Sequence, residues 1–162
     1  MVRKFVGEDV EPVRSILAKS GVFSEDELEV ALEVIDVYLS NPKQTDYELF
    51  SSVDDRDRVL GYLCMGPTPI TFGTFDLYWI AVHPDSHGRG IGRELLAFAE
   101  NLVKASGGRL IIAETSSQPR YEGARKFYES NKYEVVAHIK EYYNVGDDLL
   151  IYGKYVRSRA AC

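Results

Sequence analysis

The turn between residues 79 and 93 is the part of the chain whose residue types and spacing could carry out chemistry. An apolar run ends at Val82, and Gly88, Gly90 and Gly92 then alternate with other residues before a helix-like segment. The first amide N–H groups of a helix have no partner inside it, and the helix dipole adds positive charge there. Because glycines let an anion come close to such amides, the pattern is typical of a phosphate-binding site. The plainer interpretation is an ordinary tight turn between a strand and a helix.

Two common phosphate-binding motifs fit this turn poorly. A P-loop needs Lys followed by Ser or Thr after its last glycine, but Arg93 and Glu94 stand there. The dinucleotide-binding motif Gly-x-Gly-x-x-Gly matches at Gly88 and Gly90, whereas its third glycine falls on Arg93. Glu114 follows at about the distance expected of an acid that binds ribose, so a nucleotide-dependent oxidoreductase stays open as an alternative.

The same turn resembles the acetyl-CoA loop of the GCN5-related N-acetyltransferases, the GNAT family. In that family Gln/Arg-x-x-Gly-x-Gly/Ala follows a strand ending in Val-x-Pro. Here Val82-His-Pro84 precedes His87-Gly-Arg-Gly-Ile-Gly92, with His87 in place of the usual Gln or Arg. The resemblance implies that the loop amides hold the pyrophosphate of acetyl-CoA, and that the strand end pairs with the pantetheine amides and the thioester oxygen. The cofactor-binding residues that it implies are Ile80, Ala81, Val82, His87, Gly88, Arg89, Gly90, Ile91, Gly92, Arg93 and Tyr121.

A second stretch, residues 124–133, resembles the family's Ala-x-x-x-Tyr-x-x-x-Gly-Phe signature, with Lys132 at the glycine position. The resemblance implies that Tyr128 faces the cofactor sulfur and protonates the departing thiolate. A phenol with a pKa of about 10 suits that task. The structural alternative is a core tyrosine packed behind Phe127. Tyr121 takes the place of an Asn that the family often carries three residues before the alanine.

Glu114 is the candidate general base. It follows four apolar residues, so we expect partial desolvation and a raised pKa, which suit a proton acceptor. Ribosomal-protein N-terminal acetyltransferases carry Glu at this strand position, and the chain resembles them also at residues 141–144, a Tyr-Tyr region that lies near their incoming peptide. The alternatives are a solvated charge at the strand end, a helix-capping partner, and a water chain that leads to a more distant carboxylate, such as Asp76.

Composition limits the class of protein. With 162 residues, 45% hydrophobic and 27% charged, the sequence predicts one soluble globular domain at residues 1–156 and a flexible C-terminal tail at residues 157–162. The net charge of −6 disfavours nucleic-acid binding. No apolar run reaches transmembrane length and the first residues lack a signal-peptide core, so we expect a cytoplasmic protein that does not bind membranes.

Cysteine and histidine usage predicts neither a disulfide framework nor a metal site. The two cysteines, Cys64 and Cys162, are far apart in the sequence, and the three histidines have no Cys or His partner at metal-ligand spacing. Cys64 lies in an apolar run without a basic neighbour. We therefore expect a buried, inert thiol there rather than an acyl-carrying nucleophile.

Hydrophobic periodicity predicts the elements that position these residues. Gly21 is expected to end a first helix that Glu8 or Asp9 caps, and Ser24 with Glu27 forms a capping box before a second helix. The strand–helix–strand unit around the glycine turn implies a parallel pair. Strands are predicted at 2–6, 47–53, 59–65, 74–82, 109–115, 133–141 and 149–156, and helices at 9–19, 24–41, 90–105 and 119–131.

This order of elements matches the GNAT fold, most clearly from residue 77 to residue 133. The fold class is therefore mixed α/β (α+β): a mostly antiparallel central sheet with flanking helices and a central parallel strand pair. We predict an acetyl-CoA-dependent N-acetyltransferase that acts directly on a primary amine of a protein, a peptide or a small molecule, without a metal. The partners are acetyl-CoA and the amine, with no nucleic acid and no membrane, and a homodimer is left open. A catalytically silent acyl-CoA-binding sensor is the alternative outside enzymes.

Overall fold

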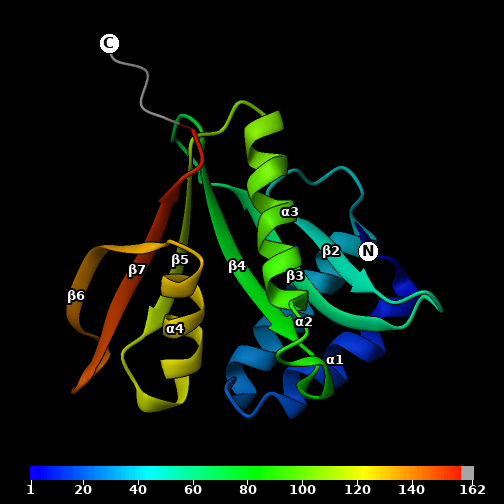
Figure 1. The fold of residues 1–162 in the computed structure, drawn as a ribbon, viewed down its shortest axis with the longest axis horizontal. Helices are drawn as coiled ribbons and strands as arrows, with labels where there is room; N and C mark the ends of the chain where they lie inside the picture. The colour runs from blue at the N-terminus through cyan, green and yellow to red at the C-terminus, as the bar shows by residue number, and fades with distance from the viewer. Residues whose placement is uncertain (158–162) are drawn as a thin grey trace. The chain divides into compact units, whose positions relative to one another are not determined.

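The computed structural model describes residues 1–157, so the tail predicted at residues 157–162 lies, apart from Arg157, outside the described residues. Seven strands form one sheet in the order β1-β2-β3-β4-β5-β7-β6 (Figure 1). β4 and β5 run parallel, while β1–β2, β2–β3, β5–β7 and β6–β7 run antiparallel. The mixed, mostly antiparallel sheet with one parallel pair and flanking helices that the sequence predicts is confirmed.

The chain forms two compact units. The first unit contains residues 1–66 and 78–99, and the second contains residues 67–77 and the chain from Glu100 onward. Strand β4 and helix α3 each continue from one unit into the other. The prediction of a single domain for residues 1–156 stays a prediction. The elements up to α3 are β1 (Val2–Lys4), a 3-10 turn (Gly7–Asp9), α1 (Val10–Lys19), α2 (Glu25–Ser40), β2 (Glu48–Val53), β3 (Val59–Pro67), β4 (Thr74–Val82), a 3-10 turn (Pro84–Ser86) and α3 (Ile91–Ala105).

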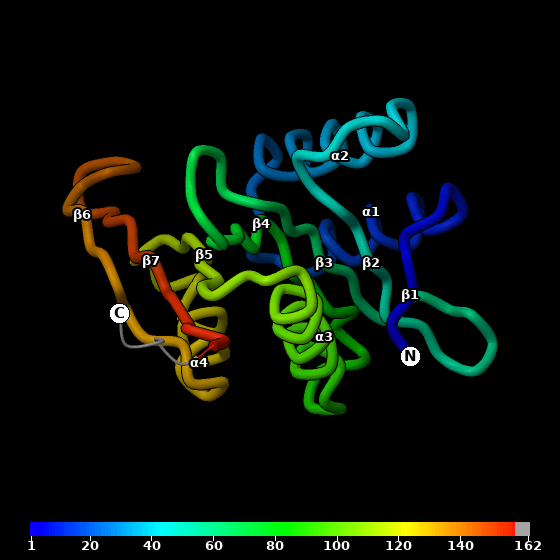
Figure 2. The backbone as a smooth tube through the Cα atoms, turned by 90° about the horizontal axis from the view of Figure 1, so that it is seen from above, coloured from blue at the N-terminus to red at the C-terminus, as the bar shows by residue number. Residues whose placement is uncertain are grey.

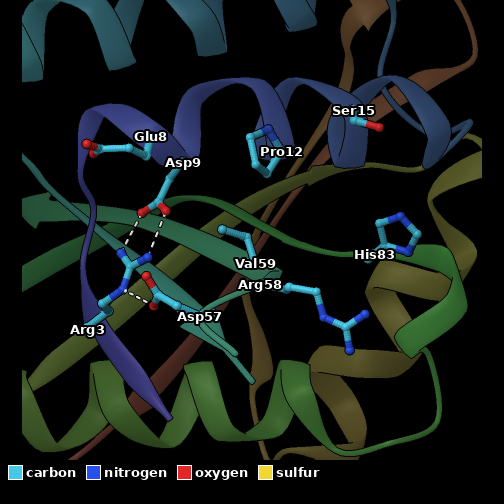
Figure 3. Close-up of a pocket in the computed structure, with 9 residues that line it drawn as sticks. All are labelled: Arg3, Glu8, Asp9, Pro12, Ser15, Asp57, Arg58, Val59 and His83. Atoms are coloured by element: carbon cyan, nitrogen blue, oxygen red, sulfur yellow. Dashed lines mark hydrogen bonds and ion pairs between the residues drawn. The ribbon is translucent and has the colours of Figure 1, made fainter. Parts of the chain in front are cut away.

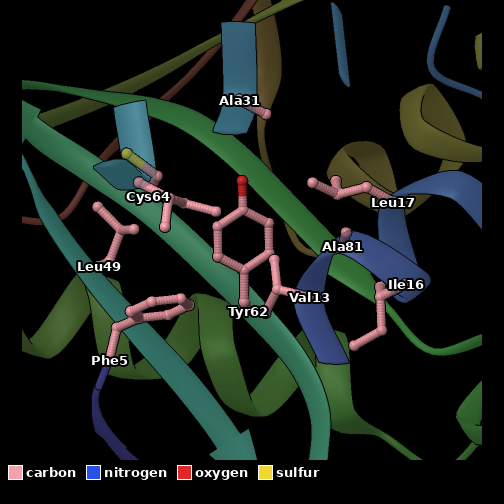
Figure 4. Close-up of a cluster of buried hydrophobic side chains, with 10 residues drawn as sticks. Phe5, Val13, Ile16, Leu17, Ala31, Leu49, Tyr62, Cys64 and Ala81 are labelled. Atoms are coloured by element: carbon pink, nitrogen blue, oxygen red, sulfur yellow. The ribbon is translucent and has the colours of Figure 1, made fainter. Parts of the chain in front are cut away.

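In the first unit, α1 and α2 lie on one side of β1–β3, and the first turns of α3 lie on the other side (Figures 1 and 2). The side chains of successive strand residues therefore point into two different hydrophobic layers, one toward α1 and α2 and the other toward α3. Leu49 is fully buried toward α1 and α2, whereas the ring of Phe50 packs on Phe98 of α3 with centroids 4.8 Å apart. The layer toward α1 and α2 surrounds Tyr62 (Figure 4) and consists of Phe5, Val13, Ile16, Leu17, Ala31, Ile35, Leu49, Tyr62, Cys64 and Ala81.

Local sequence signals fix the helix ends, with one correction. The Ser24–Glu27 capping box is confirmed, because the Ser24 hydroxyl accepts from the Glu27 N–H at 3.2 Å and the Glu27 carboxylate accepts from the Ser24 N–H at 2.7 Å. Gly21 follows α1 with a φ of +66°, as a glycine at a helix end should. The predicted cap of α1 is wrong: Asp9 occupies the N-cap position, but its side chain caps nothing in that helix.

The Asp9 carboxylate is instead the centre of a buried polar cluster. Arg3 donates to both of its oxygens, at 2.7 and 2.9 Å, and the Ser51 hydroxyl and the Val6 N–H donate at 2.8 and 3.1 Å. Only 2% of Asp9 is exposed. Burial alone would raise the pKa of this carboxyl, but the hydrogen bonds outweigh burial and hold the pKa below its ordinary value of 3.8. The cluster ties β1 and β2 to the start of α1.

The second unit contains the start of β4, the last turns of α3, β5 (Leu110–Ser116), a 3-10 turn (Pro119–Tyr121), α4 (Glu122–Ser130), β6 (Glu134–Asn144) and β7 (Asp147–Tyr155). The helix predicted at 119–131 is thus divided, because its first three residues form the 3-10 turn. β7 inserts between β5 and β6. Tyr128 of α4 stacks on Tyr152 of β7, with ring centroids 5.5 Å apart, and this contact shows which face of the strands α4 covers.

We expect Asp9→Asn to lower the free energy of unfolding at pH 7 by about 2 kcal/mol, because the half-buried Arg3 guanidinium loses its charged hydrogen bonds to the buried carboxylate and keeps only its pair with Asp57. A matched control is Glu11→Gln, which breaks an exposed Arg14–Glu11 pair and should change stability by less than about 0.5 kcal/mol. Since the pKa of Asp9 is lowered on folding, its contribution is present above pH 3.8 and is lost as the pH falls through the folded pKa. Urea titrations should show the Asp9→Asn deficit shrinking in that window; equal losses in the two variants would contradict the assignment.

Candidate active site

The glycine turn lies in the first unit and has the backbone geometry of an anion-binding loop. Gly88 and Gly90 have φ values of +73° and +82°, while Arg89 between them keeps a negative φ. Such alternation points successive N–H groups toward one concave side. The Glu94 N–H donates to the Gly90 carbonyl at 2.9 Å, which is the first bond of α3. The amides of residues 91–93 precede that bond and have no acceptor within the helix.

The space and charge around this loop suit an anion. A Cβ atom built on Gly88 or Gly90 would meet nothing within 4 Å, so the glycines are required by backbone conformation and not by crowding. Arg89 and Arg93 are exposed, and neither forms an ion pair with a carboxylate in the part of the chain that the structure describes. Both guanidinium groups thus keep their charge available beside the free amides.

His87 closes the loop onto the end of β4. Its Nε2 lies 3.0 Å from the Val82 carbonyl oxygen, and because a carbonyl only accepts, the Nε2 must carry the proton. The His87 N–H donates to the Pro84 carbonyl at 3.1 Å. His83 forms a separate hydrogen bond in this turn, in which its Nδ1 accepts from the Asp85 N–H at 3.2 Å. A direct contact between His87 and the cofactor stays a prediction; the structure gives the side chain a role in shaping the loop.

The predicted strand positions lead directly into this loop. Ile80, Ala81 and Val82 are the last residues of β4, with Ala81 buried and its two neighbours half-buried. The Ala81 carbonyl lies only 2.8 Å from where a Cβ of Gly61 would be, so β3 needs glycine at that point for β4 to pack closely. The roles predicted for residues 80–82 in binding pantetheine stay predictions.

The second unit holds Glu114, which lies on the face of β5 that points away from α4. Tyr152, which packs on α4, is opposite Ala113, so Ile112, Glu114 and Ser116 project to the other face. Glu114 is exposed, yet burial by its surroundings and, second, the charge of Asp76 raise its pKa above the ordinary 4.5. The expected desolvation and the direction of the pKa change are therefore found. A role as base stays a prediction.

Tyr128 combines a buried ring with an unengaged hydroxyl. It is 6% exposed, and its ring contacts Phe127, Tyr133 and Tyr152 at centroid distances of 5.5 to 5.7 Å. No described residue forms a hydrogen bond with its hydroxyl, and the polar atoms that are enclosed without a partner are Thr115 Oγ1 and Tyr133 Oη. The Tyr128 hydroxyl is thus not sealed off. Burial raises its pKa well above the ordinary value of 10, which keeps the phenol protonated.

Two further residues of the second unit organise the connection between β5 and α4. Tyr121 is 8% exposed, and the Arg120 guanidinium lies 5.0 Å from its ring centroid. Arg125 donates to the carbonyls of Ser116 and Gln118 at 2.7 and 3.0 Å. Arg125 is not among the residues predicted for the site, because no sequence motif links a helical arginine to the end of a strand nine residues earlier. Its contacts fix the strand end that follows Glu114.

A cavity of about 430 Å³ in the first unit contains none of the predicted site residues (Figure 3). Its charges largely satisfy one another, since Arg3 pairs with Asp9 and Asp57 and Arg58 pairs with Asp54. The lining residues are Arg3, Glu8, Asp9, Pro12, Ser15, Asp57, Arg58, Val59 and His83.

Residues 1–157 contain neither a cluster of metal ligands nor a membrane-spanning helix. Within that range no three His, Cys, Asp or Glu side chains are grouped so that they could hold a metal ion. None of the helices there has the length and apolar character needed to cross a membrane. Cys64 is buried, and burial raises the pKa of its thiol to about 12, which confirms an inert thiol.

Known proteins share this architecture. The sequence model of the acetyltransferase (GNAT) domain matches residues 46–135. The chain is 39% identical to a proposed GNAT acetyltransferase from Desulfovibrio desulfuricans, with a TM-score of 0.90 over 97% of this chain and 99% of that one. An aminoglycoside 6'-N-acetyltransferase complexed with coenzyme A (17% identity, TM-score 0.76, 99% of each chain) shares the fold. So does the ribosomal-protein-S18-alanine N-acetyltransferase of Escherichia coli (16% identity, TM-score 0.74, 100% of this chain and 98% of that one).

No curated protein sequence matches the chain significantly. The structural similarities below 25% identity establish a shared fold and do not identify the substrate. The domain match covers more than half of the chain, and the 39% identity extends over nearly all of it. On these two findings, the chain belongs to the GNAT family of acetyltransferase enzymes.

Proposed function

We propose that this enzyme transfers an acetyl group from acetyl-CoA directly to a primary amine. The observation that carries the proposal is the loop at residues 88–93, where alternating φ signs, free helix amides and two unpaired arginines form a site for a pyrophosphate. A neighbour in fold binds coenzyme A, which agrees with this assignment. A cytoplasmic location stays a prediction, and a homodimer is still left open.

Glu114 would remove the proton from the incoming ammonium. The amine nitrogen then attacks the thioester carbonyl, the carbon–sulfur bond breaks, and the sulfur leaves as a thiolate that must gain a proton. The nitrogen releases its second proton as the amide forms, which balances the proton that the sulfur gains. A carboxylate with a raised pKa accepts a proton more readily than an ordinary one, which suits the first step. Tyr128 would donate to the sulfur, since its phenol is protonated and its hydroxyl is not engaged elsewhere.

The acceptor should bind as a cation. On the face of β5 that bears Glu114, the carboxylates of Asp76 and Asp147 are also present, while Lys154 lies on the face toward α4 and pairs there with Glu100. Two neighbours in fold are an aminoglycoside 6'-N-acetyltransferase and a ribosomal-protein-S18-alanine N-acetyltransferase. Both kinds of acceptor carry ammonium groups, and a primary amine is the chemistry that they share.

Ligand-dependent stability tests cofactor binding. Acetyl-CoA at a hundredfold excess over its Kd should stabilise the folded protein by about 2.7 kcal/mol in a thermal-shift measurement, and NAD should not. Gly90→Val should abolish the acetyl-CoA effect, because a side chain would stand between the anion and the amides. Gly21→Val is the matched control: it has a similar positive φ and equally open surroundings, so both variants bear a strain of about 1–2 kcal/mol. Stabilisation by NAD alone would favour the oxidoreductase, and binding without turnover of any amine would favour the sensor.

We expect Tyr128→Phe to lower kcat by about 10² to 10⁴ while acetyl-CoA affinity stays the same, because one hydroxyl is lost and the ring packing is kept. The control is Tyr152→Phe in the same aromatic cluster. Its hydroxyl donates to Glu129 at 2.8 Å, so its loss should cost about 1 kcal/mol of stability without changing kcat. Thiol release from acetyl-CoA with one amine measures both rates, and wild-type turnover in Tyr128→Phe would remove the acid assignment.

Glu114→Gln should lower the rate most at low pH, and the deficit should shrink as the pH rises, because free amine becomes plentiful and needs no base. A pH–rate profile on one amine measures this; a deficit independent of pH would leave Glu114 as a positioning residue.

Thermal stability gives a second test of the Glu114→Gln variant. Since the pKa of Glu114 is raised on folding, its contribution is fully present below pH 4.5 and is lost as the pH rises through the folded pKa. The variant cannot ionise there, so its advantage in thermal stability over wild type should grow with pH.

A further inference from the structure

Two carboxylates of the second unit lie side by side on adjacent parallel strands. Asp76 of β4 pairs in register with Ile112 of β5, and Glu114 follows Ile112 by two residues, so both carboxylates project from the same face of the sheet. α4 packs on the opposite face, through Tyr152. The two acids therefore share an environment that no helix of this unit covers (Figure 2).

Asp76 and Glu114 differ in what holds them. The Thr68 hydroxyl, from the segment that precedes β4, donates to Oδ2 of Asp76 at 2.7 Å. A hydrogen bond to a carboxylate favours its ionised form. Glu114 has no hydrogen bond to any residue in the described part of the chain, and neither acid has a Lys, Arg or His partner there. The structure thus gives the Asp76 carboxylate a hydrogen-bond donor in Thr68 and leaves the Glu114 carboxylate without one.

The other groups around Glu114 do not offset this charge. On the same face, β7 carries Asp147, which accepts from the Ser116 hydroxyl, and Tyr155 opposite Leu110, while the regularly paired part of β6 carries Glu134 opposite Gly153. The cations of the second unit's strands lie on the face toward α4. There Lys154 pairs with Glu100, His138 with Asp148, and Lys140 neighbours Asp148. Glu114 therefore faces negative charge alone, and Asp76 is the charge that affects it most after burial.

We propose that Asp76 is a positioning residue of the acetyl transfer, whose negative charge, fixed by Thr68, acts through Glu114 and makes it a better proton acceptor. The inference rests on the proposed function, in which Glu114 is the base. It also gives the two acids different roles, since Glu114 takes the proton from the ammonium and Asp76 acts on Glu114 through its charge. A like charge close by disfavours ionisation of its neighbour, which is the physical basis of the effect.

The test is the pH dependence of kcat/KM for one primary amine at saturating acetyl-CoA, because its limbs report the ionisations of the enzyme–acetyl-CoA complex and of the free amine. The limb that disappears in Glu114→Gln belongs to Glu114. In Asp76→Asn this limb should move to lower pH, with the plateau reduced by less than about tenfold because the base becomes weaker. Thr68→Val should move the limb in the same direction by a smaller amount, and it serves as the second variant if Asp76→Asn does not fold. Asp147→Asn removes another carboxylate from the same face and should leave the limb in place.

Each outcome decides the inference. A limb that is unmoved in Asp76→Asn, or moved as far by Asp147→Asn, would overturn it. A limb abolished by Asp76→Asn would make Asp76 the base itself. If no amine is acetylated, the proposed function fails, and an NMR titration of the Glu114 carboxyl in wild type and Asp76→Asn still measures the coupling. An unchanged titration midpoint there would sink the inference independently of any turnover.

Discussion

The parallel pairing of β4 with β5 is the constraint on which the candidate site depends. Parallel neighbours cannot be joined by a tight turn, so the chain must return along the sheet before β5 begins, and a helix is the usual means of return. Here α3 makes that return, and its first turn therefore follows the end of β4 within a few residues. The free amides of residues 91–93 are a direct result. Gly88 and Gly90 then adapt the short connection so that these amides and the loop face the same space.

What the sequence predicts well is local. The Ser24–Glu27 capping box and the bounds of β4 both follow from residues within a few positions of one another. What it does not predict depends on distant pairing. From the sequence alone, Asp9 has the residue type and position of a helix N-cap. In the structure its carboxylate instead accepts a hydrogen bond from the hydroxyl of Ser51, 42 residues away. Hairpin patterns also cannot say that β7 lies beside β5 or that Asp76 pairs in register with Ile112, and the second of these pairings defines the face that Asp76 and Glu114 share.

Charge in the second unit is divided between the two faces of its strands. Lys154 and His138 lie toward α4, where each has an acidic partner, Glu100 and Asp148 respectively. The other face holds Asp76 and Glu114 without a cation from β5, β6 or β7. Unpaired carboxylates on a partly apolar surface cost stability unless a cation arrives from outside. An ammonium substrate supplies that cation, so the feature that makes this face unfavourable in the free protein is the feature that would favour its acceptor.

The raised pKa of Tyr128 bears on the last step of the transfer. A phenol whose pKa exceeds 10 is a poor acid toward a thiolate in water, where thiol groups have pKa values of about 8.5. The comparison changes in an apolar pocket, because desolvation disfavours the charged form of the sulfur as well and raises its pKa too. If the thiolate forms where the ring of Tyr128 is buried, the two groups stay closer in proton affinity than either value in water suggests. The aromatic packing that first looks like a purely structural role for Tyr128 would then also support its chemistry.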